Sequence, residues 1–385
     1  MYQGREVAHR LLRSHEAGVH YGCVRDTVQQ DELHACATTS TSHRGSERAA
    51  MNVTLVTITN AKRWHLLERT LRAALENGAD RAVLVDNEAQ EEIASRTEQA
   101  FPGRVHTIRL EHNQGSAGAY CAGLQAAMET GAEFLLLLDD DNCVEPQTIP
   151  VLQETYKLLS ATTPPEQLCV VGFRPDHMSE ILRGRPHELI SSSGDAFFMF
   201  HMADLPKKLW KWISGRRQAV PAEAANPPRR LFHQRTAPFG GMFFHRSVIE
   251  RHGLPDRRFV LYQDDIEFSY RISSTGGEIV VAPQALIADL EQSWGIADRS
   301  TIFGKLINLG SDRQVYYTTR NRAYFESHCR EHSRIRKVNR AVFLFTLWSV
   351  ACLRRRTARF RLIVKAIHDG EGAVLGINPE FPLSG

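Results

Sequence analysis

The chain has 385 residues, 42% hydrophobic and 24% charged, which suits a globular protein with one large domain and additions. Its net charge is only +3, and the basic excess is local: Arg330 to Lys365 holds eleven Arg or Lys against one acid, so the charge pattern excludes a general nucleic-acid-binding role. Seven scattered cysteines without a CxxC pair indicate reduced thiols in a cytoplasmic protein, with neither a disulfide framework nor a zinc site.

Residues 1–50 contain five histidines, mixed charges and a Thr/Ser-rich end. They show neither sustained periodicity nor the apolar core of a signal peptide, so we expect a disordered extension outside the fold. Met51 directly precedes the first strand pattern and is a candidate natural start. A short helix over Val7 to Leu12 is the alternative interpretation.

Strand and helix patterns alternate from Asn52 onward. Helices are expected where apolar residues recur at helical spacing, as Leu67, Leu71 and Leu75 do. The expected strands cover 53–58, 82–86, 105–110 and 134–138, and the expected helices cover 64–77, 90–100 and 117–130. This alternation predicts an α/β fold of Rossmann-like type, with a mostly parallel sheet and helices on both faces.

Three consecutive carboxylates, Asp139 to Asp141, follow the most apolar of these strands. The carboxyl edge of an open α/β sheet is where ligands bind. Adjacent carboxylates repel one another, so either a cation neutralises them or water solvates all three. Asp139 and Asp141 point alike and are candidate ligands of Mg²⁺ or Mn²⁺, while Asp140 points away. A solvated acidic turn is the alternative.

Short polar residues and glycines follow the other strands at the same predicted edge. They can bond a base, a ribose and a pyrophosphate, because backbone must approach phosphate closely and helix N-termini attract anions. The candidate nucleotide-binding residues are Thr57, Thr59, Asn60, Asp86, Asn87, Asn113, Gly115 and Gly118. An isolated Asn-x-Gly-x-x-Gly turn is weak evidence for nucleotide binding, because any tight strand-to-helix connection can use it. The order of this turn relative to the acids is stronger evidence.

The order of these motifs resembles a known family. The runs VTLVTITN, VLVDN, HNQGSAGAYCAGL and LLLLDDDN are similar to the nucleotide-sugar half of family-2 inverting glycosyltransferases of the GT-A fold, especially the bacterial galactofuranosyl- and rhamnosyltransferase branch. The resemblance continues in FGGMFFHRSVIERHGLPDRRFVLYQDDIEFSYRISSTGG and covers Asn52 to Arg322. It implies a catalytic domain over 51–322, with a nucleotide-sugar-binding half over 51–145 and an acceptor-binding half over 146–322.

The resemblance implies roles for the first acidic motif. Asp86 would contact the nucleobase, and Asp140 would join the loop residues in binding the donor. Asp139 and Asp141 would hold the Mn²⁺ or Mg²⁺ that bridges the diphosphate. Such a metal assists departure of the nucleoside diphosphate as a Lewis acid.

A second acidic motif, QDDIE, covers 263–267 at the start of a predicted helix. The family's general base is the second acid of this motif, so Asp265 is expected to accept the acceptor's hydroxyl proton, with Asp264 and Glu267 orienting it or the acceptor. Acids that merely stabilise a helix N-terminus are the alternative interpretation. Gly240 and Gly241 precede Met242 at a place where backbone can lie close to a sugar, and these two glycines and Trp294 are the candidate acceptor-binding residues.

Two positions depart from the family's pattern. Many relatives carry a metal-binding His after a strand that follows the base, and Asp289 stands there. An aspartate also offers oxygen to Mg²⁺ or Mn²⁺, so Asp289 is a third candidate ligand, and an unrelated surface acid is the alternative. Relatives often have Ser or Thr where this chain has Glu88 to Gln90, so the sequence does not identify the donor sugar.

The last third of the chain, 323–385, is predicted to be helical. Its apolar run from Ala341 to Leu353 has 13 residues, too few to cross a bilayer, which takes about 20. Basic residues flank the run, which favours peripheral contact with an anionic membrane through 336–361. A buried core or dimer-interface helix is the alternative. The basic, aromatic insertion within 200–236 is either a lid, a lipid-linked acceptor contact or a solvated loop.

Together these patterns predict a metal-dependent inverting glycosyltransferase that uses a UDP- or dTDP-sugar of galactofuranose or rhamnose type. Its acceptor is expected to be a cell-surface glycan or a lipid-linked glycan. The expected location is the cytoplasm or the inner face of the cytoplasmic membrane, with oligomeric state left open. The alternatives are a nucleotidyltransferase that makes sugar nucleotides and a non-catalytic sugar-nucleotide-binding partner in polysaccharide assembly.

Overall fold

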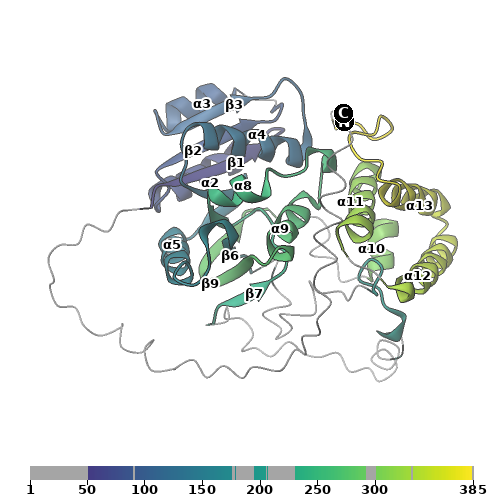
Figure 1. The fold of residues 1–385 in the computed structure, drawn as a ribbon. Helices are drawn as coiled ribbons and strands as arrows, with labels where there is room; N and C mark the ends of the chain where they lie inside the picture. The colour runs from purple at the N-terminus through teal and green to yellow at the C-terminus, as the bar shows by residue number, and fades with distance from the viewer. Residues whose placement is uncertain are drawn as a thin grey trace, which may run out of the picture. The chain divides into compact units, whose positions relative to one another are not determined.

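The computed structural model describes residues 51–89, 92–175, 178, 195–204, 206, 230–291, 301–330 and 333–383. These belong to one compact unit that begins at Ala50 (Figure 1). The predictions for the extension 1–50, for Trp294 and for most of the 200–236 insertion lie outside the described residues.

A single sheet organises the described part of the chain, with strand order β3-β2-β1-β4-β8-β6-β9-β5 and β7 paired to β9. The first four strands are parallel neighbours. The strands span β1 Val53–Thr59, β2 Arg81–Asp86, β3 Val105–Arg109, β4 Phe134–Asp139, β5 Asn142–Val144, β6 Leu168–Phe173, β7 Phe232–Gln234, β8 Met242–His245 and β9 Glu278–Asp289. The predicted α/β fold with a mostly parallel sheet is therefore confirmed.

Antiparallel β8 enters the sheet beside β4, and β6 and β9 continue beyond it as a parallel pair. At its far end β9 pairs with β5, which places Asp289 opposite Asn142. This pairing brings a residue from late in the chain to the acids that follow β4.

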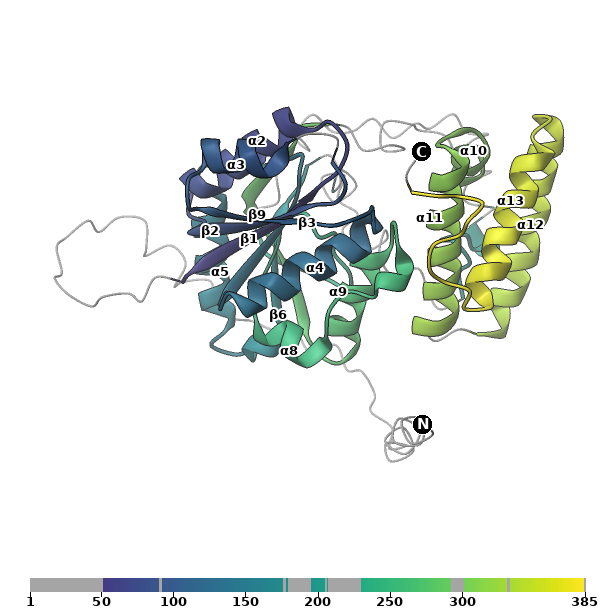
Figure 2. The same cartoon turned by 90° about the horizontal axis from the view of Figure 1, so that it is seen from above.

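Helices cover both faces of the sheet (Figure 2). The helices of the sheet region are α2 Trp64–Glu76, α3 Ile93–Ala100, α4 Gly115–Glu129, α5 Thr148–Leu159, α8 Ser247–His252 and α9 Asp264–Ser274. One core contains side chains of α2, α3 and α5, and the other contains side chains of α4, α8 and α9.

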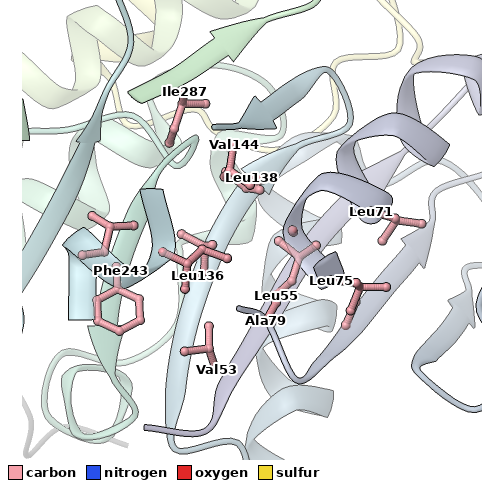
Figure 3. Packing of buried hydrophobic residues seen from close by; sticks show 14 of the residues in the cluster. Val53, Leu55, Leu71, Leu75, Ala79, Leu136, Leu138, Val144, Phe243 and Ile287 are labelled. Atoms are coloured by element: carbon pink, nitrogen blue, oxygen red, sulfur yellow. The ribbon is translucent and has the colours of Figure 1, made fainter. Parts of the chain in front are cut away.

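Alternation along β4 explains the two cores. Leu136 and Leu138 pack into the first core, shown in Figure 3, while Leu135 and Leu137 pack into the second. All four are fully buried, and burying such a side chain contributes about 1.5–3 kcal/mol. Hydrophobic burial on both faces therefore holds the strand that carries the acids.

The described C-terminal residues form four helices and a π-helical turn over Phe325–Cys329, as the helical prediction expected. The helices are α10 Ile302–Asn308, α11 Asp312–Tyr324, α12 Arg334–Leu353 and α13 Thr357–Glu371. They share a third core with three phenylalanines, Phe197, Phe198 and Phe200.

Helix α12 has two unlike faces. Phe343 and Leu347 are buried in the third core, in line with the core-helix interpretation, whereas Phe345 is 67% exposed and Trp348 47% exposed. Within the described ranges, each helix falls short of the length or the apolarity needed to cross a membrane.

Candidate active site

A cavity of about 750 Å³ lies at the carboxyl edge of β1 and β4. Its lining includes the loop after β1, the acids after β4 and the segment 261–266 at the start of α9. It therefore brings together the two acidic motifs, which are far apart in the sequence.

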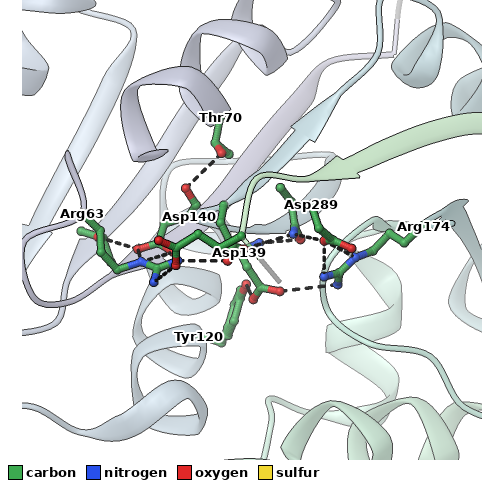
Figure 4. Close-up of polar contacts among 11 residues, drawn as sticks. Arg63, Thr70, Tyr120, Asp139, Asp140, Arg174 and Asp289 are labelled. Atoms are coloured by element: carbon green, nitrogen blue, oxygen red, sulfur yellow. Dashed lines mark hydrogen bonds and ion pairs between the residues drawn. The ribbon is translucent and has the colours of Figure 1, made fainter. Parts of the chain in front are cut away.

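Asp139 is the most exposed of the three consecutive acids, with 42% of its side chain accessible. Its Oδ1 accepts a hydrogen bond of 2.9 Å from the Tyr120 hydroxyl, and its Oδ2 lies 3.6 Å from Nη1 of Arg174 (Figure 4). One carboxylate at the cavity is thus held in place while remaining accessible to a ligand.

Asp140 ties the end of β4 to the loop after β1. Its Oδ2 accepts a bond of 2.8 Å from Oγ1 of Thr59, and Nε of Arg63 donates to it at 3.0 Å. Burial raises the pKa of Asp140 to about 7, although Arg63 and the Thr59 hydrogen bond oppose the shift. Arg63 also pairs with Asp141 at 3.0 Å, so it neutralises charge on two of the three acids.

Asp289, a predicted metal ligand, does not belong to the cavity lining and is paired with Arg174. Nε of Arg174 donates to its Oδ1 at 2.9 Å, and Nδ2 of Asn142 donates to the same oxygen at 2.9 Å. The Arg174 side chain is only 3% exposed. A glycine at position 240 makes space for the side chains of Arg174 and Asn142. A Cβ there would lie 2.4 Å from Nη1 of Arg174 and 2.1 Å from Oδ1 of Asn142.

The carboxylates near the cavity partly match the ligands that a hard divalent metal ion needs. Within the described ranges, groups of three or more His, Cys, Asp and Glu side chains arranged to hold a metal are absent. Mg²⁺, however, is usually bound by one or two carboxylates plus substrate phosphates. Asp139 and Asp141 supply two such carboxylates. Both carboxylates are also paired with arginines, Asp139 with Arg174 and Asp141 with Arg63.

The second acidic motif opens α9 beside the same cavity. Asp264 is 3% exposed, and its Oδ2 accepts a bond of 3.0 Å from Oγ of Ser116. Asp265 also lines the cavity. Burial raises the pKa of both carboxyls, and repulsion from Asp265 adds to the rise at Asp264. Glu267 is not part of the lining and pairs with Arg271 at 2.8 Å.

The predicted nucleotide-binding residues divide into two groups. Three of them line the cavity, namely Thr59, Asn60 and Asn87. The other five, Thr57, Asp86, Asn113, Gly115 and Gly118, do not belong to its lining.

The residues outside the lining have structural contacts. Oδ1 of Asp86 accepts from the Ala89 amide at 2.7 Å, and Oδ1 of Asn113 accepts from the Gly115 amide at 2.9 Å. A Cβ on Gly115 would lie 2.1 Å from the Val260 carbonyl oxygen, and Gly115 has a φ of +73°. This glycine therefore allows the segment before α9 to pack against α4.

That segment has an unusual backbone. Val260, Tyr262 and Gln263 have φ values of 67°, 66° and 65°, a region that costs a residue with a side chain about 1–3 kcal/mol. Nδ2 of Asn321 in α11 lies 2.7, 2.7 and 2.8 Å from the carbonyl oxygens of residues 259, 261 and 262. Arg320 adds a bond of 3.0 Å to the first of these oxygens.

Some residues of the site could not be predicted from sequence patterns. Arg63 and Arg174 contact acids 77 and 115 residues away, so neither sits in a local motif. Asn321 lies within the range Asn52 to Arg322 that the resemblance covers, but its contacts with the segment before α9 depend on tertiary packing.

The sheet and the two acidic groups at one cavity define a GT-A-type fold. Residues 52–301 match the sequence profile of a family described as "Glycosyltransferase like family 2". This match covers more than half of the chain, which therefore belongs to that family. The predicted class of enzyme, a glycosyltransferase of family-2 type, is thereby confirmed.

Comparisons with individual proteins are more distant. A search of curated proteins gave no match. A crystal structure of GalNAc-T7 with UDP, GalNAc and Mn²⁺ is 14% identical with a TM-score of 0.47, covering 76% of this chain but only 54% of that one. S. aureus TarS 1–349 with UDP-GlcNAc is 11% identical with a TM-score of 0.47, covering 83% of this chain and 80% of that one.

Proposed function

We propose that this protein transfers a sugar from a UDP- or dTDP-sugar to a hydroxyl of a glycan, with inversion at the anomeric carbon. The proposal rests on one observation: Asp139, Asp141 and Asp265 line the same cavity. Its volume of about 750 Å³ falls within the range of about 300–1,000 Å³ typical of small-molecule sites.

The donor would lie along the loops after β1 and β2. Thr59, Asn60 and Asn87 present short polar groups there. We assign Asp139 and Asp141 to Mn²⁺ or Mg²⁺, which when bound would neutralise the charge on the departing diphosphate. Arg63 and Arg174 hold these two carboxylates at the cavity.

Asp265 is the proposed general base. The acceptor oxygen attacks the anomeric carbon from the face opposite the diphosphate, its proton passes to Asp265, and the bond to the diphosphate breaks. Asp264 is fixed by Ser116 and keeps the first turn of α9 in place. Glu267 pairs with Arg271 outside the cavity, so we assign it to the stability of α9.

The finer identity of the substrates rests on the sequence resemblance. It favours a galactofuranose- or rhamnose-type donor and a cell-surface or lipid-linked glycan as acceptor. It also favours a donor-binding half over 51–145 and an acceptor-binding half over 146–322. For location, we propose the cytoplasmic side of a membrane, with α12 as the peripheral contact.

Nucleotide binding by Asp141→Ala tests the proposal. UDP and dTDP should bind the wild-type protein more tightly with Mn²⁺, and Asp141→Ala should lose the Mn²⁺-dependent part of the affinity while remaining folded. A panel of nucleotide sugars, screened by thermal shift, would identify the donor because ligands that bind the native state raise the melting temperature. Equal metal-dependent binding by wild type and Asp141→Ala would refute the metal assignment.

Donor turnover separates the alternatives. Metal-dependent release of UDP or dTDP from the donor supports the transferase. Its absence from protein that binds the donor would favour the non-catalytic partner, and release of pyrophosphate from a nucleoside triphosphate and a sugar phosphate would favour the nucleotidyltransferase.

A further inference from the structure

The tight turn at residues 197–200 has an unfavourable backbone conformation. Phe197 and Phe200 exchange two backbone hydrogen bonds, of 3.0 and 2.8 Å. Between them, Phe198 and Met199 have φ values of 51° and 60°. Positive φ at both central positions is typical of a two-residue turn of type I′, which favours Asn and Gly because a side chain is poorly tolerated there. Large side chains occupy both positions here, so contacts outside the turn must hold it in this conformation.

Three phenylalanines anchor the turn in the third core. Phe197, Phe198 and Phe200 are all buried, and their ring centroids lie 5.3, 5.5 and 6.0 Å from that of Phe343 in α12. The Phe198 amide also donates a hydrogen bond of 3.1 Å to Glu326, a buried carboxylate in the π-helical turn after α11. These contacts fix the turn on the C-terminal helices.

Met199 is the exposed residue of this turn. Its exposed fraction is 41%, and it lines the cavity of about 750 Å³ that Asp265 also lines. Core packing accounts for the three phenylalanines but not for an exposed methionine at a position that favours glycine. Strained positions of this kind are concentrated at functional sites. The turn therefore holds an apolar, flexible side chain at the wall of the candidate active site.

The same turn lies against the helix proposed to contact the membrane. Helix α12 packs Phe343 on the turn, while its exposed face carries Phe345 and Trp348, whose ring centroids are 5.9 Å apart. The third core thus joins the cavity wall at Met199 to the proposed membrane contact. An acceptor anchored in a membrane would bring an apolar chain as well as a sugar to this part of the molecule.

We propose that Met199 contacts the apolar group next to the sugar of a lipid-linked acceptor and thereby selects a glycolipid over a free glycan. The acceptor's sugar would lie beside Asp265 in the same cavity, and its lipid would continue towards α12. This inference rests on the proposed glycosyltransferase function and narrows its acceptor to one that carries an apolar group. Methionine suits this role because its flexible thioether packs against apolar groups of variable shape.

Binding of two glycosides that share a sugar but differ in their apolar group tests the inference. The full-length protein is first saturated with UDP and Mn²⁺, which occupy the donor site, and is then titrated calorimetrically with methyl or octyl glucoside below the micelle concentration. The variant is Met199→Gln, which keeps the length of the side chain but makes its end polar. The matched control is Met202→Gln, because Met202 is 42% exposed but does not belong to the cavity lining.

We expect octyl glucoside to bind the wild type at least about tenfold more tightly than methyl glucoside, because each buried CH₂ group strengthens binding by a factor of about four. In Met199→Gln this preference should fall to about threefold or less, whereas Met202→Gln should keep it. A preference that persists in Met199→Gln would place the chain elsewhere, for example on the exposed face of α12, and would overturn the inference. Absence of the preference in the wild type, including absence of binding, would overturn it as well.

Met199→Gly separates the contact with the acceptor from the stability of the turn. Glycine adopts a positive φ without strain, so this variant should keep the melting temperature of the wild type while losing the preference for octyl glucoside. A melting temperature lowered in both Met199 variants, together with weaker UDP binding, would show that Met199 only supports the fold. Failure of UDP and Mn²⁺ to bind the wild type in the first step would instead count against the proposed function.

Discussion

Asp265 carries the most direct residue-scale prediction. Asp265→Asn keeps the size and shape of the side chain but removes its capacity to accept a proton. We expect kcat to fall by about 10²- to 10⁴-fold, the usual contribution of a general base, with donor affinity unchanged. Single-turnover kinetics and nucleotide titration measure the two quantities.

Asp264→Asn is the matched control for this prediction. The amide can still accept a hydrogen bond from Ser116, so its effect on kcat should be smaller. If Asp264→Asn were the inactive variant and Asp265→Asn retained near-normal kcat, the role of base would belong to Asp264.

The raised pKa of Asp265 predicts how the activity depends on pH. Burial raises the pKa of Asp265, and a general base works only when deprotonated. Activity should therefore be full above the raised pKa and decline as pH falls through it, at a higher pH than for an ordinary aspartate of pKa about 3.9. A kcat profile that stays flat down to that ordinary value would contradict the assignment.

The buried pair of Arg174 and Asp289 makes a prediction about stability. Arg174→Gln would leave Asp289 buried without its charged partner, and such a loss typically costs about 3–5 kcal/mol. Urea denaturation of Arg174→Gln should show this decrease in the free energy of unfolding.

Arg251→Gln provides the control, because an exposed pair contributes about 0–1 kcal/mol. A decrease for Arg174→Gln no larger than that of the control would mean that Asp289 does not depend on Arg174.

At the scale of elements, the sequence predicts the first four strands well. Each lies within one or two residues of its predicted bounds, because apolar runs with helical segments between them permit few other assignments. The helix predicted over 117–130 begins at Gly115, so the glycine turn is part of α4 rather than a loop before it.

The order of the later strands could not be predicted in the same way. β8 inserts between β4 and β6, and β9 extends to pair with β5, through contacts between distant residues. The same holds for the candidate site. Its acids lie in short sequence motifs and could be predicted, whereas Arg63, Arg174 and Asn321 reach the site only through tertiary structure.

Asn321 carries the prediction for the contact between α11 and the segment before α9. Asn321→Ala removes a fully buried amide whose Nδ2 contacts three carbonyl oxygens. Unsatisfied buried groups cost about 1–3 kcal/mol, and the segment 259–263 should relax from the positive φ values of Val260, Tyr262 and Gln263. We expect kcat to fall at least tenfold, with UDP affinity unchanged and faster amide exchange in this segment.

Asn308→Ala, at an exposed asparagine, is the control for general effects of truncating this amide. If Asn321→Ala changed stability but left kcat and amide exchange of 259–263 at the wild-type level, Asn321 would have only a structural role.

At the scale of the whole molecule, the exposed face of α12 predicts membrane contact. Phe345, Trp348 and Leu353 are exposed, and Arg354 to Arg356 follow directly. Each basic residue near an anionic surface contributes about 1 kcal/mol. Replacing these three arginines by Glu should release the protein from anionic vesicles in a sedimentation assay.

Salt should also weaken vesicle binding of the wild type, because it screens the attraction. Arg251→Glu, far along the chain from α12, should bind as the wild type does. Unchanged binding of the triple variant at low salt would favour a protein partner on this face of α12.

The contact between Asn321 and the segment before α9 also affects the order in which a new chain gains its properties. Asn321 follows Tyr262 by 59 residues, which a ribosome adds in about 3–12 s at about 5–20 residues per second. Throughout that interval β1 to β4 and their acids have already been synthesised. The segment before α9 is therefore synthesised before the Asn321 side chain that contacts its carbonyl oxygens, so this contact can form only after α11 has been made.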